Sequence, residues 1–182
     1  MRSPAAMILA PMGLLRRRGD ELNGRRFRMR EKLVSIGDDF WIEDEAGNRA
    51  YRVDGKALRF RDTFVLEDAS GREVAKIQER KLSIRDKMAI ERNGKTIATV
   101  HKALVGIRDR FAIDVEGGDD LKAKGNILDH EYEIERDGDT IARISKRWFR
   151  VRDTYGVELA PNEDEGLLLA AVVALESLTD KR

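Results

Sequence analysis

The stretch LLLAAVVAL at residues 167–175 decides the fold, because it is a run of nine apolar residues in a chain that is 38% charged. A helix that is apolar on every side is buried on every side. We therefore expect a buried helix over residues 163–179. The acidic residues 163–165 suit the positive end of its dipole, and Asn162 with Glu165 fits a capping box.

A strand motif repeats between residues 27 and 161, with an apolar residue, an aspartate and two further apolar residues at alternate positions. Successive aspartates lie 24, 24, 23 and 44 residues apart, and the long interval contains a degenerate copy near Asp129. Such alternation predicts strands with one buried face, and a fixed interval predicts an array of β-units. The copies are Ile36-x-Asp38-x-Phe40-x-Ile42, Phe60-x-Asp62-x-Phe64-x-Leu66, Ile84-x-Asp86-x-Met88-x-Ile90, Ile107-x-Asp109-x-Phe111-x-Ile113 and Val151-x-Asp153-x-Tyr155-x-Val157.

Turn sequences separate the two strands of each unit. Asn93-Gly94 and Asp137-Gly138 suit the two positive-φ positions of a type I′ hairpin turn. Six units of two strands give about twelve antiparallel strands. Closing them into a barrel removes the exposed edges, and a barrel of this size has a lumen that must be filled. We predict a mainly β fold, a closed barrel of hairpin repeats around the central hydrophobic C-terminal helix.

With these features the chain resembles the LURP-one-related family of the tubby-like superfamily over about residues 28–178. The segments that carry the resemblance are MREKL (29–33), IGDDFWI (36–42), VDGKAL (53–58), NILDHEY (126–132) and SKRWFRVRDTYGV (145–157). The resemblance implies a twelve-stranded barrel around a hydrophobic helix, and it does not imply an enzyme. Tubby itself binds phosphoinositide head groups through basic side chains on its barrel, but those side chains have no matching positions here. Phospholipid scramblases are thought to share this fold, and microbial family members have no assigned activity.

Residues 1–26 differ from the barrel domain expected at residues 27–182. The first 30 residues carry eight arginines against two acidic residues, whereas the remaining 152 have 27 basic and 32 acidic side chains. We expect residues 1–26 to be a disordered basic extension. The alternatives are that this segment makes weak contact with a membrane surface, or that translation starts nearer Met29. The acidic body argues against nucleic-acid binding. No apolar run reaches the length of a transmembrane helix, and the chain has no cysteine.

Catalytic and metal-binding patterns are not expected. His101 and His130 have no third group at motif spacing, so both histidines are interpreted as structural or exposed. The repeated aspartates could be interpreted as a ring of calcium ligands. Their regular position, mostly directly after an arginine, favours a structural role instead. We expect no metal ion and no cofactor.

The basic stretch with aromatic residues at 146–152 is the candidate ligand site. In strand alternation Lys146, Trp148, Arg150 and Arg152 share the outer face, where they can hold an anionic head group. The alternative is an ordinary solvated surface with the tryptophan packed over arginine stems. We expect a monomeric, non-enzymatic binding or scaffold domain in the cytoplasm or at a membrane surface, with anionic lipid or another protein as partner. The other hypothesis is a soluble small-ligand or protein-interaction module with no membrane role.

Overall fold

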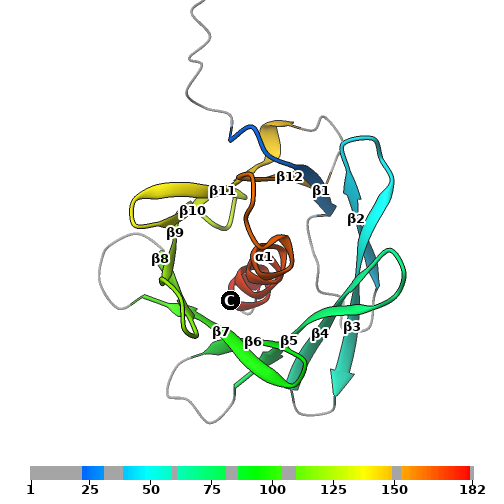
Figure 1. The fold of residues 1–182 in the computed structure, drawn as a ribbon, viewed down its shortest axis with the longest axis vertical. Coiled ribbons are helices and arrows are strands. Elements are labelled where there is room, and N and C mark those ends of the chain that lie inside the picture. Colours follow the sequence, from blue (N-terminus) through cyan, green and yellow to red (C-terminus); the bar gives the residue numbers. More distant parts are fainter. Residues whose placement is uncertain are drawn as a thin grey trace, which may run out of the picture.

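The computed structural model confirms the closed barrel. It describes residues 22–30, 39–58, 61–80, 86–103, 110–148 and 153–180. Twelve antiparallel strands follow one another around the barrel, and β1 pairs with β12 to close it (Figure 1). The strands are β1 (Arg26–Arg30), β2 (Phe40–Asp44), β3 (Arg49–Leu58), β4 (Arg61–Asp68), β5 (Glu73–Glu79), β6 (Lys87–Arg92), β7 (Lys95–Lys102), β8 (Arg110–Val115), β9 (Leu121–Asn126), β10 (Glu131–Arg136), β11 (Asp139–Ser145) and β12 (Thr154–Leu159).

The repeat predicted the inner wall of the barrel. The two apolar positions that follow each aspartate point into the lumen in all six units, and the described pairs are buried. These residues are Phe40, Ile42, Phe64, Leu66, Met88, Ile90, Phe111, Ile113, Tyr132, Ile134, Tyr155 and Val157. The hairpin turns also form as expected, because Asn93 and Gly94 have φ values of 51° and 73°.

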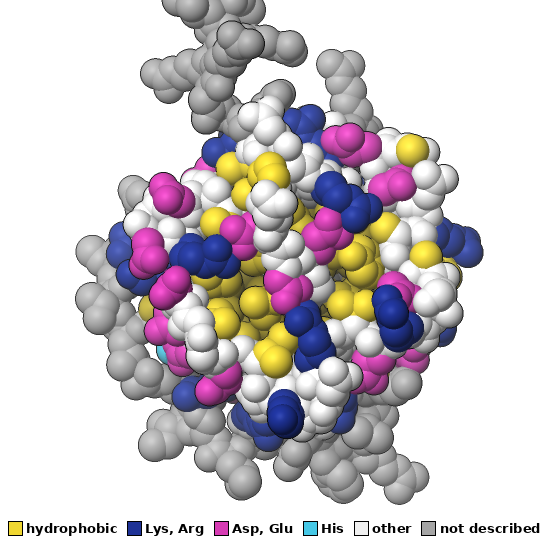
Figure 2. All heavy atoms as spheres, viewed as in Figure 1, with side chains coloured by type: hydrophobic (Ala, Val, Ile, Leu, Met, Phe, Trp, Pro, Cys, Tyr) yellow, Lys and Arg dark blue, Asp and Glu magenta, His cyan; other side chains and the backbone are white. Residues whose placement is uncertain are grey.

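The lumen is filled by helix α1 (Glu165–Asp180), which lies inside the ring of strands in Figure 1. Residues 167–175 are all buried, as the apolar run predicted. At 1.5 Å per residue the helix is about 24 Å long. It packs most closely against β5, β6 and β7. Figure 2 shows hydrophobic side chains at the centre of the barrel, surrounded by charged side chains of both signs.

The start of the helix corrects the predicted capping box. The cap is Asp164, whose Oδ1 accepts a hydrogen bond from the Leu167 amide at 3.0 Å. Asn162 instead has a positive φ of 64° in the turn before the helix. A side-chain acceptor one residue before the first helical residue reaches the third helical amide, a geometry that Asn162 does not have.

Three arginines hold this end of the helix to the barrel. Acidic residues 163–165 pair in order with Arg136, Arg92 and Arg25, at 2.8, 2.9 and 2.8 Å. Tyr51 also donates a hydrogen bond of 3.0 Å to Glu165. Arg136 and Arg92 lie on β10 and β6, and Arg25 directly precedes β1, so the acidic run positions the helix within the lumen as well as complementing its dipole.

Candidate functional site

The structure places the predicted basic stretch at one end of β11, where the chain leaves the barrel wall. Lys146 and Trp148 lie in a short 3-10 helix, η1 (Lys146–Trp148), and therefore not in the strand that the alternation assumed. Arg150 and Arg152 lie outside the described residues. The prediction that these four side chains share one face of a strand is therefore wrong for Lys146 and Trp148.

Local hydrogen bonds explain why the strand ends at Ser145. Its hydroxyl oxygen accepts from the Arg147 amide at 3.1 Å, and Glu131 Oε1 accepts from the Lys146 amide at 3.2 Å. The Ser145 hydroxyl also donates to Glu131 at 3.0 Å. Side chains thereby satisfy backbone donors that a continuing strand would offer to its neighbour, so the chain turns away from the sheet.

Trp148 packs against Arg26 on the outer wall of the barrel. The guanidinium carbon of Arg26 lies 5.6 Å from the Trp148 ring centroid, within cation–π range. Arg26 also pairs with Glu158 at 3.0 Å, and the Glu158 side chain is only 1% exposed. The contact is with the guanidinium group, whereas the alternative given above placed the tryptophan over the aliphatic stems of arginines.

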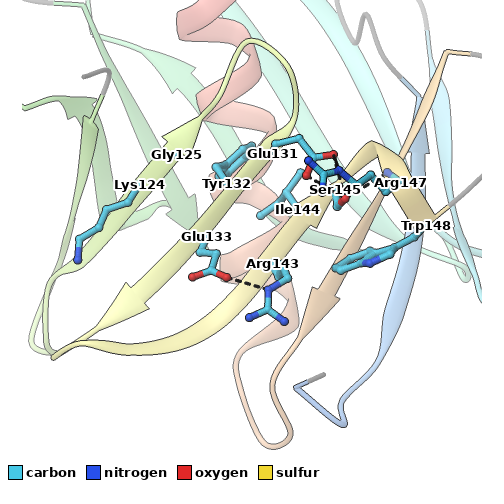
Figure 3. A pocket seen from close by; sticks show the side chains of 10 residues that line it. All are labelled: Lys124, Gly125, Glu131, Tyr132, Glu133, Arg143, Ile144, Ser145, Arg147 and Trp148. Atoms are coloured by element: carbon cyan, nitrogen blue, oxygen red, sulfur yellow. Dashed lines mark hydrogen bonds and ion pairs between the residues drawn. The ribbon is translucent and has the colours of Figure 1, made fainter. Parts of the chain in front are cut away.

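A pocket of about 490 Å³ lies beside Trp148 on the outer wall, a volume typical of small-ligand sites. Figure 3 shows its lining side chains on β9, β10, β11 and η1. They are Lys124, Gly125, Glu131, Tyr132, Glu133, Arg143, Ile144, Ser145, Arg147 and Trp148. Lys124, Glu133 and Arg143 are cross-strand neighbours, because Glu133 is paired in register with both of the others.

Arg143 has donor capacity that the described residues do not use. Its Nε donates to Glu133 at 2.8 Å, whereas its Nη1 is buried and has no hydrogen-bond partner among the described residues. A buried donor without a partner is costly. Arg147 is 84% exposed and lies 3.5 Å from Glu131, and Lys124 pairs with Glu135. The pocket therefore has two guanidinium groups in its lining, of which that of Arg147 is exposed to an incoming acceptor.

Gly125 lets β9 approach β10 closely at the pocket floor. A Cβ atom at Gly125 would lie 2.6 Å from the Glu131 carbonyl oxygen and 2.8 Å from the Tyr132 Cα. Its φ of 130° also favours glycine. The turn beyond it carries Leu128, whose side chain is 55% exposed. Among the described residues, Leu128 is the only large hydrophobic residue that is exposed.

The two histidines lie apart from the pocket lining and occupy different environments. His101 Nε2 lies 3.0 Å from Asp114 on the outside of the barrel. His130 is buried, with its Nε2 2.9 Å from Glu176 of the central helix and its ring 4.3 Å from the Tyr155 ring. Within the part of the chain that the structure describes, no three acidic or histidine side chains are arranged to hold a metal ion.

Burial of Tyr132 raises its pKa well above the usual value, and the charge of Glu176 raises it further. Tyr132 therefore stays protonated at neutral pH. Its hydroxyl is buried and has no hydrogen-bond partner among the residues described. The Tyr132 side chain belongs to the core, and the residue also lines the outer pocket.

The aspartates of the repeat are only partly described. Asp86 and Asp153 are exposed, and Asp153 has a positive φ of 58°. The side chains of Asp38, Asp62 and Asp109 lie outside the described part of the chain. A structural role for these aspartates therefore stays a prediction.

Sequence reasoning missed most of the pocket. Lys124, Glu133 and Arg143 come from three strands, and their convergence depends on register rather than on spacing within one segment. One sequence pattern could have pointed to the pocket: polar residues occupy the outward positions of β10 and β11, on either side of the Asp137-Gly138 turn. The one predicted residue that the pocket includes is Trp148.

Across the described ranges, no helix combines the length and the apolar character needed to span a bilayer.

Comparisons with known proteins agree with this architecture. A search of curated proteins found no match. The X-ray structure of a protein from Arabidopsis thaliana is similar, with a TM-score of 0.65 at 19% identity, over 87% of this chain and 93% of that one. The family model described as LURP-one-related matches residues 25–176. The chain therefore belongs to the LURP-one-related family.

Proposed function

We propose that this barrel is a non-enzymatic binding domain whose outer-wall pocket holds an anionic group, the phosphate of a phospholipid head group. The observation that carries the proposal is that two arginines line one pocket, the exposed Arg147 and Arg143, whose Nη1 has no hydrogen-bond partner among the described residues. A phosphate oxygen is a strong acceptor for guanidinium donors, and arginine is suited to bind it.

Two apolar side chains support a membrane-bound ligand. Trp148 borders the pocket, and Leu128 is exposed on the turn that joins the two pocket strands β9 and β10. Tryptophan and leucine are suited to the boundary between head groups and acyl chains. Lys146 and the arginines at 150 and 152 add positive charge to the same segment of sequence, which anionic lipid surfaces attract. We place the protein in the cytoplasm, at the surface of a membrane.

The second candidate function is a soluble small-ligand or protein-interaction module. The ion pairs favour it, because arginines on the outer wall such as Arg26, Arg28 and Arg52 already face carboxylates. Paired arginines attract a polyanionic surface less than free arginines do. This candidate predicts binding of a dissolved partner with no dependence on vesicles.

Vesicle co-sedimentation separates the two candidates. Wild-type protein is expected to pellet with vesicles that contain phosphatidylserine or phosphoinositide at low salt, and to remain in solution with pure phosphatidylcholine. Arg143→Gln should weaken pelleting, whereas Arg52→Gln is a matched control, because Arg52 is likewise paired with a cross-strand glutamate, Glu67, but lies outside the pocket. Absence of pelleting with every anionic vesicle at low salt would rule out the lipid proposal.

A further inference from the structure

We infer that the pocket selects a phosphate ester that also carries a primary ammonium group, such as a phosphoethanolamine or phosphoserine head group. This inference rests on the proposed function, since it assumes that the phosphate lies at Arg143. It goes further by assigning a role to the two carboxylates in the same pocket, Glu131 and Glu133.

The two carboxylates face the pocket together. Glu131 and Glu133 alternate with the buried Tyr132 along β10, so both lie on the outer wall, at a spacing of about 7 Å along the strand. Their side chains are 31% and 37% exposed. Glu131 accepts hydrogen bonds from Ser145 and the Lys146 amide, and Glu133 accepts one each from Arg143 and Thr140. A carboxylate has about four acceptor sites, so each of them can accept a further donor.

The charge of the pocket argues against a simple polyanion. Its lining contains three basic side chains, Lys124, Arg143 and Arg147, and two carboxylates, which give a net charge of +1. A head group with several phosphates would meet repulsion from Glu131 and Glu133, and is expected to bind less tightly than one with a single phosphate. A single phosphate diester brings one negative charge to the basic side chains, and an ammonium group on the same molecule is attracted by the carboxylates.

The ammonium is expected to be primary rather than quaternary. A primary ammonium has three N–H donors for carboxylate oxygens, whereas a choline group has none and depends on aromatic faces. The described pocket lining offers Trp148 and Tyr132 as its aromatic residues. Arg26 already lies over the Trp148 ring, and the Tyr132 side chain is buried. The pocket therefore lacks the free aromatic cage that choline needs and has the acceptors that a primary amine needs.

Soluble head groups test the selectivity. Trp148 fluorescence is measured in a Trp41→Phe background, which leaves one tryptophan, during titration with glycerophosphoethanolamine, glycerophosphocholine and glycerol 3-phosphate. We expect glycerophosphoethanolamine to bind at least about tenfold more tightly than glycerophosphocholine. Glu133→Gln should remove this preference while phosphate binding persists. Glu67→Gln is the control, because Glu67 is likewise paired with a cross-strand arginine, Arg52, and neither residue lines the pocket. Far-UV circular dichroism verifies that each variant is folded.

The outcomes separate this inference from the proposed function. Equal affinity for all three compounds would overturn the selectivity and leave phosphate binding in place. Binding of none of them, in solution or as vesicle lipid, would overturn both. A parallel comparison of vesicles containing phosphatidylethanolamine with vesicles containing phosphatidylcholine, at equal anionic lipid content, identifies the source of the ligand. A preference seen only with the dissolved compounds would assign the pocket to a free phosphoamine.

Discussion

Replacement of Leu169 by alanine tests the packing of the central helix. Leu169 is fully buried in the core. The substitution removes three carbon groups, worth about 2.4 kcal/mol at about 0.8 kcal/mol each. The surrounding wall is a closed hydrogen-bonded ladder that cannot collapse into the space, so a cavity contribution raises the expected loss to about 4 kcal/mol. That is a large part of the 5–15 kcal/mol typical of a folded domain.

Urea unfolding followed by far-UV circular dichroism measures this loss. Leu128→Ala is the matched control, because the same substitution at a 55% exposed side chain is expected to cost at most about 0.5 kcal/mol. Aspartate at Leu169 or Val172 should prevent folding, since the charge would be buried without a partner. A loss below about 1 kcal/mol for Leu169→Ala, or stable folding of the aspartate variants, would refute the central-helix packing.

Three further predictions concern the helix start and the pocket floor. Burial alone would raise the pKa of Asp164, but hydrogen bonds from Arg92 and the helix backbone lower it below the usual value. The stabilisation by Asp164 is therefore present at neutral pH and is lost as the pH falls below about 4. Asp164→Ala should cost about 1 kcal/mol at pH 7 in chemical denaturation and much less near pH 2, and an equal loss at both pH values would contradict this. Burial and the hydrogen bond to Glu165 raise the pKa of Tyr51 to about 12, so Glu165→Gln should lower one tyrosine midpoint in an ultraviolet titration; an unchanged curve would count against the bond. Gly125→Ala should lower stability by more than about 1 kcal/mol in thermal unfolding, because its Cβ would clash with the backbone of β10, and a wild-type melting temperature would disprove the close approach.

The fold was predictable because its signals are local and repeated. Alternation such as Met88-x-Ile90 identifies the inner face of a strand from a few residues, and the Asn93-Gly94 turn fixes the hairpin that follows. The apolar run at 167–175 then has one suitable place, the lumen. Each of these patterns reflects a requirement of burial or backbone geometry that is met within a short segment.

The pocket was less predictable because it depends on contacts between segments. Strand alternation extended through Lys146 and Trp148 gave the wrong geometry, since it ignored Glu131, a distant acceptor for the Lys146 amide. The convergence of Glu133 and Arg143 follows from the register of β10 and β11, which contains a shift between Ile134 and Glu135. Register shifts of this kind change which side chains face each other and leave no clear mark in the sequence.

The indole N–H signals of the two tryptophans test the central proposal most directly. Trp148 borders the pocket, whereas Trp41 lies on β2 and does not line it. Phospholipid nanodiscs that contain phosphatidylserine are added to ¹⁵N-labelled protein, with pure phosphatidylcholine nanodiscs as the control. We predict that phosphatidylserine shifts or broadens the Trp148 signal much more than the Trp41 signal, and that Arg143→Gln reduces this effect. An unchanged Trp148 signal, or a change confined to Trp41, would contradict the assignment of the pocket as the lipid-binding site.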